Sequence, residues 1–358
     1  MLTCRACRGT AGEIVLDLGA MPASDTFPPL ADPGPDPVHP LRMWQCAACG
    51  LAQLAEDPTT PEEPRGVEPA ALVAQARDAV GKVTEAGLLR AGMTVAEYGS
   101  PHGGSWLPML ADLGLRSVGP GTRAEVVLDC FGMMHAADQQ AAVAERAGRL
   151  TDGGILLLQY HSLAAIVRSG QWNALRHGHF AYYSAAALRR MFAPVGLTPT
   201  AAWEFDLYGG TVLLAFSRGR GIDHPESIGP AGQLQQQVDF SATALRKWLL
   251  GEAERGRRVI GYGAASRAVA LLVRAGVDAD LLASVADASP AKWGRRMPGT
   301  RIPVIRPAEL AADPPDAVLL FVPDLLAEVR RQLPELTAAG TSWVSAEPSP
   351  RLVAGPGG

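Results

Sequence analysis

Short apolar runs alternate with amphipathic stretches along most of this chain, a pattern typical of strands followed by helices. The clearest unit is Val95–Ser105, where an apolar run meets a glycine-rich turn and then a stretch of helical spacing up to about Leu113. Glycines 99, 103 and 104 permit a positive φ and a close approach of backbone to a ligand. Many α/β folds present backbone to a ligand in this way, although the same pattern also serves as a plain strand-to-helix connection.

The rest of the pattern predicts an α/β protein with a mostly parallel sheet in its middle part. Strands are expected at 94–98, 116–118, 126–129, 154–159, 199–205, 211–216, 282–286, 317–322 and 342–345. Helices are expected at about 70–91, 105–113, 137–149, 184–194 and 238–255. A second strand–glycine turn–helix unit opens at 258–266, and a polar, aromatic and histidine-rich insertion occupies 160–183.

Three domains follow from this pattern. Residues 1–58 form a cysteine-bearing module, 70–217 an α/β domain, and 238–358 a smaller Rossmann-like domain. Proline- and glutamate-rich residues at 57–69 and a glycine- and glutamine-bearing stretch at 218–237 are predicted to be linkers.

Composition narrows the possible partners. The chain has 358 residues, enough for two or three domains of roughly 150 residues each. A net charge of −4 gives no general affinity for nucleic acid or an anionic membrane, so we expect a small-molecule partner. No apolar run reaches membrane-spanning length, and no apolar stretch follows Met1. The expected location is the cytoplasm, and the oligomeric state is left open.

Four of the five cysteines occur as two CxxC pairs, Cys4/Cys7 and Cys46/Cys49. In a cytoplasmic chain, paired CxxC motifs favour a tetrahedral Cys4 zinc site over disulfides, because each knuckle presents two thiolates. A redox role would need only one such motif on a βαβ unit. The predicted zinc is structural, since four cysteine ligands leave no open coordination position.

Taken together, these features resemble the three-domain deoxysugar C-methyltransferases, which act on nucleotide-linked keto-sugars in antibiotic pathways. That family joins an N-terminal zinc domain, a central S-adenosylmethionine (SAM) domain and a C-terminal Rossmann-like domain. The similarity covers nearly the whole chain. It rests on the paired CxxC motifs and on the segments His177–Ser184, Tyr208–Thr211, Gly261–Ser266 and Asp287–Pro303.

The departures from the family fall on its chemistry. The family's Tyr-His-Glu-His motif is replaced here by Arg176-His177-Gly178-His179, which leaves His179, with His135 as a match for a second histidine. Glu97, Gly99 and Gly103 resemble the first SAM motif. A SAM domain normally ends its second strand in a carboxylate that holds the ribose, whereas here that strand runs into Val118 and Gly119. A helix and a strand are missing before the next predicted strand, so the SAM-methyltransferase-like domain is trimmed.

Three functions remain open from the sequence. The favoured one is a repurposed enzyme of bacterial specialised metabolism that performs SAM-independent acid/base chemistry such as cyclisation, elimination or isomerisation. Its candidate catalytic residues are His179, His177, His135 and Tyr208, because histidine transfers protons near neutral pH. Backbone hydrogen bonding is the plainer role for these histidines. The alternatives are an active SAM-dependent C-methyltransferase of a nucleotide-linked keto-deoxysugar and a non-catalytic pseudo-methyltransferase that binds a partner protein.

Overall fold

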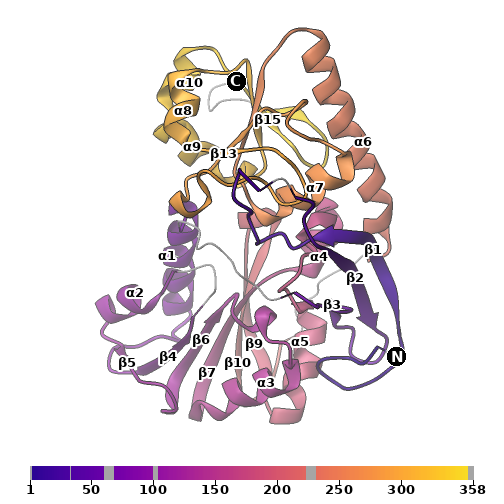
Figure 1. Cartoon of the computed structure of the whole chain (residues 1–358). Coiled ribbons are helices and arrows are strands. Elements are labelled where there is room, and N and C mark those ends of the chain that lie inside the picture. Colours follow the sequence, from indigo (N-terminus) through magenta and orange to yellow (C-terminus); the bar gives the residue numbers. More distant parts are fainter. Residues whose placement is uncertain (1, 33, 60–67, 100–103, 223–230, 354–358) are drawn as a thin grey trace.

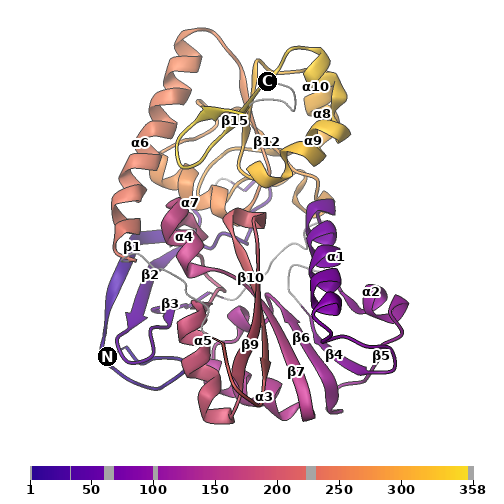
Figure 2. The same cartoon turned by 180° about the vertical axis from the view of Figure 1, so that it is seen from behind.

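The computed structural model describes residues 2–32, 34–59, 68–99, 104–222 and 231–353 as three sheets with their flanking helices (Figure 1). Gly103, one of the predicted SAM-motif glycines, lies outside these described residues. The C-terminal sheet sits above the middle sheet in both views, and the N-terminal sheet packs at one side of their junction (Figure 2).

The N-terminal module is a four-stranded antiparallel sheet that borrows one strand from elsewhere in the chain. Its own strands are β1 (Gly12–Pro22), β2 (Val38–Cys46) and β3 (Ala52–Leu54). The fourth strand, β8 (Ala181–Tyr182), comes from the histidine-rich insertion and pairs with β3. The insertion is therefore held against the cysteine module by backbone hydrogen bonds.

The middle domain is a six-stranded sheet of order β5-β4-β6-β7-β10-β9. The first four strands are parallel, and β10 and β9 are antiparallel additions. The strands are β4 (Thr94–Tyr98), β5 (Arg116–Ser117), β6 (Ala124–Cys130), β7 (Leu150–His161), β9 (Thr198–Phe205) and β10 (Thr211–Ser217). The helices are α1 (Ala70–Glu85), α2 (Leu107–Asp112), α3 (Gln139–Gly148), α4 (Leu163–Ser169) and α5 (Ala185–Phe192).

The C-terminal domain carries a second six-stranded sheet, of order β13-β12-β11-β14-β15-β16, parallel except for its last strand. Its strands are β11 (Val259–Tyr262), β12 (Val285–Ala286), β13 (Val304–Ile305), β14 (Ala317–Leu320), β15 (Ser342–Ser345) and β16 (Arg351–Leu352). Its helices are α6 (Gln233–Glu254), α7 (Ser266–Ala275), α8 (Pro307–Ala312), α9 (Leu326–Gln332) and α10 (Pro334–Ala338).

Some clusters of buried apolar residues join the modules, and others lie within the middle domain or within the C-terminal domain. One cluster contains Leu16 and Met43 of the N-terminal sheet, Leu245 of α6 and Leu271 of α7. Helix α6 accordingly runs from the N-terminal sheet to the top of the C-terminal domain (Figure 1). Burial of this shared apolar surface, at about 25 cal/mol per Å², fixes the modules against one another. None of the described helices combines the length and apolar character that crossing a membrane needs.

Several predicted boundaries were wrong. Helix α1 ends at Glu85 and not at 91, because Gly87 adopts a positive φ of 72° and starts a turn. Helix α6 begins at Gln233, inside the predicted linker 218–237, because Leu234 and Val238 bury an apolar face against the shared core. The predicted strand at 282–286 is limited to β12.

Candidate functional site: a cavity between three modules

The four predicted zinc ligands come together at one end of the N-terminal sheet. The Sγ atoms of Cys4, Cys7, Cys46 and Cys49 all lie within 4.8 Å of one another. The Cys4–Cys49 and Cys7–Cys46 sulfur distances are 3.5 and 3.6 Å, close to the roughly 3.8 Å that tetrahedral zinc with 2.3 Å bonds requires. The residues therefore fit zinc, and the ion, when bound, holds the two knuckles together.

The zinc knuckle also docks on the middle domain. Arg8, which follows the first CxxC and has a φ of 64°, donates to the Asp138 carboxylate at 2.6 Å. Asp138 caps the N-terminus of α3 by accepting from the Ala141 backbone N–H. This contact supports the segment just before α3, which carries His135.

A cavity of about 300 Å³ lies where the middle domain, the insertion and the C-terminal domain meet. Its walls include the carboxyl ends of β4, β6 and β7, the start of α1, and the turn that precedes α7. The carboxyl ends of parallel strands are where open α/β sheets usually bind ligands. The position of the cavity is thus the expected one for this fold.

Two of the residues that line this cavity have strained backbones. Phe131 follows β6 with a φ of 61°, and Tyr208 follows β9 with a φ of 57°. Non-glycine residues rarely adopt this region, and such strain concentrates at functional sites. The turn at Phe131 is held by the buried Asp129 carboxylate, which accepts from the backbone N–H groups of Gly132 and Met133 and pairs with Arg146.

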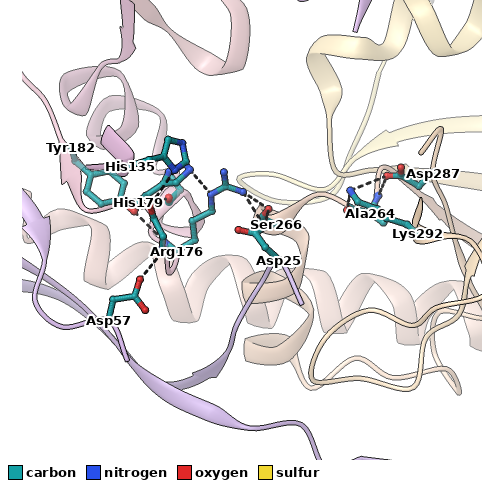
Figure 3. A network of polar contacts seen from close by, with 12 residues as sticks. Asp25, Asp57, His135, Arg176, His179, Tyr182, Ala264, Ser266, Asp287 and Lys292 are labelled. Atoms are coloured by element: carbon teal, nitrogen blue, oxygen red, sulfur yellow. Dashed lines mark hydrogen bonds and ion pairs between the residues drawn. The ribbon is translucent and has the colours of Figure 1, made fainter. Parts of the chain in front are cut away.

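Arg176 belongs to the insertion and contacts both the N-terminal module and the C-terminal domain beside the predicted histidines (Figure 3). Its Nε donates to His179 Nε2 at 2.7 Å, and its Nη1 donates to Ser266 Oγ of the C-terminal domain. The same Nη1 lies 3.3 Å from the Asp25 carboxylate of the N-terminal module, and Ser266 Oγ also donates to Asp25. Because Arg176 Nε must donate, His179 Nε2 carries the lone pair and the His179 imidazole is neutral.

The His135 ring packs against the His179 ring. The two rings meet edge to face with centroids 4.6 Å apart, and His135 Nδ1 lies 3.1 Å from the Gly178 carbonyl oxygen. Burial, and then the charge of Arg176, lowers the pKa of His135 to about 4. His135 is therefore neutral at pH 7. It is not among the residues that line the cavity, whereas His179 is.

The structure separates the other predicted catalytic residues. Tyr208 lines the cavity, and burial raises the pKa of its hydroxyl, which stays protonated. His177 lies away from the cavity lining, is 3% exposed, and has its Nε2 3.2 Å from the Pro40 carbonyl oxygen. His177 therefore contacts backbone, as in its plainer predicted role, but the backbone belongs to β2 of the N-terminal sheet and not to the insertion.

In the described part of the chain, the SAM motif lacks the acid that would hold the ribose of SAM. The two Glu97 carboxylate oxygens accept from Ser105 Oγ and the Trp106 backbone N–H. Strand β5 ends without an acid, and within the described chain it is the edge of its sheet, since the turn 118–123 leads directly into β6. The Glu68 carboxylate covers Gly104 so closely that an added Cβ would lie 2.2 Å from Glu68 Oε1.

The backbone of the second glycine turn, which follows β11, is hydrogen-bonded by side chains of the C-terminal domain itself. The carboxylate of Asp287, just after β12, accepts from the backbone N–H groups of Ala264 and Ser289 at 2.7 and 2.8 Å. Lys292 Nζ donates to the Ala264 carbonyl oxygen at 2.7 Å (Figure 3). The backbone donor that an anion would use at Ala264 is therefore already satisfied.

Several residues in or beside the cavity were not predicted as functional. Arg176 was identified only as a departure from a motif, and Asp25 and Ser266 were not singled out, because their meeting depends on how three modules pack. Gln159 also lines the cavity. A signal for Gln159 was present in the sequence, since a glutamine interrupts an otherwise apolar strand.

Comparisons with known proteins match the two ends of the chain to family models. Residues 4–63 match a family described as a zinc binding domain, and residues 224–348 match the C-methyltransferase C-terminal domain. The C-methyltransferase NovU of Streptomyces niveus is 24% identical over 241 residues, which cover 63% of this chain and 57% of NovU.

Similar solved structures include two methyltransferases crystallised with S-adenosylhomocysteine. The N-methyltransferase NodS of Bradyrhizobium japonicum aligns with a TM-score of 0.32 and 11% identity, covering 43% of this chain and 90% of NodS. Magnesium protoporphyrin IX methyltransferase of Synechocystis aligns with a TM-score of 0.32 and 11% identity, covering 42% of this chain and 84% of that enzyme.

Proposed function

Because this chain belongs to a diverged branch of the C-methyltransferase family with an N-terminal zinc-binding domain, we propose that it is a SAM-independent acid/base enzyme. Its substrate is a ring-bearing metabolite held in the cavity between the middle and C-terminal domains. The observation that carries the proposal is the His179–Arg176 contact at the cavity wall. The neutral imidazole of His179 lines the same cavity as Glu97 of the SAM-like motif, which supports the proposal.

His179 is the proposed base. Its Nε2 lone pair faces Arg176 Nε–H, so proton transfer begins when a substrate oxygen takes over that N–H and frees the nitrogen. The freed Nε2 then accepts a proton from a ring carbon next to a carbonyl group. The positive guanidinium stays close through Asp25 and Ser266, where it stabilises the negative charge that develops on the carbonyl oxygen.

Tyr208 supplies the matching acid. Its hydroxyl keeps its proton because burial raises its pKa, so it donates a hydrogen bond to the substrate oxygen. Proton return from His179 to a different ring atom completes an isomerisation with no net gain or loss of protons. His135 is a positioning residue in this scheme, because it touches the His179 ring and does not line the cavity.

The decisive test begins with SAM and S-adenosylhomocysteine titrated calorimetrically into zinc-loaded protein. We expect no heat of binding up to millimolar ligand, because the ribose-holding carboxylate is missing and Glu97 is engaged. Micromolar binding would instead support an active C-methyltransferase of a nucleotide-linked keto-deoxysugar.

Candidate ring ketones are then incubated in D₂O, and deuterium uptake at the carbon beside the carbonyl is followed by NMR. His179→Gln should abolish enzyme-dependent exchange, whereas His177→Gln should leave most of it, since His177 lies outside the cavity. A non-catalytic protein would show no exchange with any variant. Equal loss in both variants would contradict the assignment of His179.

Arg176→Gln gives an independent check through His135. Burial, and then the charge of Arg176, lowers the pKa of His135 to about 4, so removal of that charge should raise this pKa by the part of the shift that Arg176 contributes. An NMR titration of the imidazole measures this shift, and an unchanged pKa would contradict the contact.

A further inference from the structure

Strand β7 is apolar along most of its buried length, and it carries polar side chains where it reaches the cavity. Its residues alternate between two buried faces, with Leu156, Leu158 and Tyr160 on one side. Ile155 and Leu157 point to the opposite side, into the core beneath α1 and α2. The next two positions of that second face are Gln159 and His161, and both line the cavity.

Both side chains carry a buried nitrogen without a partner. Gln159 is 1% exposed, and its Nε2 has no hydrogen-bond partner among the residues that the structure describes. His161 Nε2 also lacks a partner of hydrogen-bond geometry in the described chain, although the Gln171 side chain and the Tyr208 backbone interact with the His161 imidazole. Gln139 shows the contrasting case. It is equally buried, but its Nε2 donates to the Met133 and Ala136 carbonyl oxygens, and its Oε1 accepts from Tyr183.

Buried polar groups are normally hydrogen-bonded, because an unmade bond leaves the cost of desolvation uncompensated. Two such groups side by side on one strand face, both at the same cavity, indicate partners supplied by a ligand. Burial and the charge of Arg267 lower the pKa of His161 to about 3, so its imidazole is neutral in the working range. The side chain therefore forms neutral hydrogen bonds.

The spacing and charge of the site define the ligand class. Positions i and i+2 of a strand are about 6.5–7 Å apart, which matches polar groups on opposite sides of a six-membered ring. The lining carries three cationic side chains, Arg176, Arg267 and Lys292, and three acidic ones, Glu68, Glu97 and Asp324. This balance favours an uncharged ring over a strongly ionic one.

We infer that Gln159 and His161 form the recognition face for an uncharged six-membered ring bearing oxygen on opposite sides. A carbonyl oxygen of the ring accepts from Gln159 Nε2, and a hydroxyl group across the ring pairs with His161 Nε2. This inference rests on the proposed function in that the same cavity holds the substrate, and it names the ring chemistry that the cavity selects.

The first test needs no ligand. Gln159→Met replaces the amide with an apolar group of similar shape, so the melting temperature of zinc-loaded protein should stay the same or rise by about 1–3 °C. The matched Gln139→Met should lower it by several degrees, because it breaks three hydrogen bonds. A comparable loss at Gln159 would show a structural role and overturn the inference.

The second test uses 4-hydroxycyclohexanone as the probe, with cyclohexanone and cyclohexanol as the one-oxygen comparisons, in ligand-observed NMR. We expect the two-oxygen ring to bind about tenfold more tightly than either comparison, corresponding to one hydrogen bond. Gln159→Met and His161→Phe should each remove that advantage. Equal binding of all three rings, or binding insensitive to both substitutions, would overturn the inference.

His179→Gln separates the two proposals. It should abolish proton exchange while it leaves probe binding intact, because recognition of the ring oxygens is assigned to Gln159 and His161 and proton abstraction to His179. Probe binding without exchange in the unaltered protein would support the recognition face and contradict the acid/base function. Exchange without selective probe binding would support the acid/base function and contradict the recognition face.

Discussion

The two glycine turns of this chain follow the same local pattern in two differently built sheets. In the C-terminal domain, the first strand β11 is flanked on one side by β12 and then β13, and the acid after β12, Asp287, bonds to the turn after β11. In the middle domain, β4 has only β5 on that side within the described chain, and no acid follows β5. The turn after β11 is therefore hydrogen-bonded by the acid that follows the adjacent strand, whereas the turn after β4 has no such acid beside it in the described chain.

The packing around the glycines differs in the same way. A Cβ on Gly263 would lie 2.6 Å from Val322, and a Cβ on Gly261 would lie 2.9 Å from both Phe321 and Val285. A Cβ on Gly99 would meet no described atom within 4 Å. A strand–glycine turn–helix pattern thus specifies a turn, whereas the neighbouring strands decide how that turn is packed and hydrogen-bonded.

The largest expected effect is at Asp287. Asp287→Ala leaves the N–H groups of Ala264 and Ser289 without their acceptor, which should cost about 2–4 kcal/mol of unfolding free energy. Urea unfolding of the zinc-loaded protein measures the loss. Asp152→Ala, whose side chain is 98% exposed, is the control and should change little. If Asp287→Ala lowers the unfolding free energy as little as Asp152→Ala does, the Asp287 carboxylate does not stabilise the second turn.

Gly263→Ala should have the next largest effect, about 2–3 kcal/mol, because φ is +91° and the new methyl group meets Val322. Calorimetric melting of the variant provides the measurement. Adding Val322→Ala removes the clash but not the unfavourable φ, so the double variant should recover part of what the single Gly263 variant loses. Strictly additive losses would argue against the contact.

Glu97→Ala should cost about 1 kcal/mol, the usual value for removing a carboxylate that caps a helix start. The Trp106 N–H and Ser105 Oγ lose their acceptor in this variant. Hydrogen exchange at Trp106 should speed up while the turn at Ala264 remains protected. If Glu97 instead belongs to an intact SAM site, the variant would lose SAM binding, which we expect to be absent from the start.

The smallest effect is expected at Gly99. Gly99→Ala should change stability by less than about 0.5 kcal/mol, because the added methyl group meets no described atom. Thermal melting beside Gly263→Ala tests the comparison directly. A loss similar to that at Gly263 would show that the first turn is as tightly packed as the second.

Much of the candidate site was visible in the sequence because its signals are local. The CxxC pairs predicted a cluster that the structure brings within 4.8 Å. The polar insertion predicted a histidine-bearing wall, and His179 and Tyr208 do line the cavity. The failures were also physical in origin, since α6 starts early because distant apolar residues stabilise its first turn.

The sequence alone determined the fold class, the zinc knuckles and the loss of the strand and acid that a SAM site needs, because each depends on residue type and near spacing. Only the tertiary structure decided which polar groups meet. His177 and His179 are two residues apart, yet one bonds to Pro40 outside the cavity and the other to Arg176 at its wall. Hydrogen bonds between Asp25, Arg176 and Ser266 require three modules to pack together, and no local pattern encodes that arrangement.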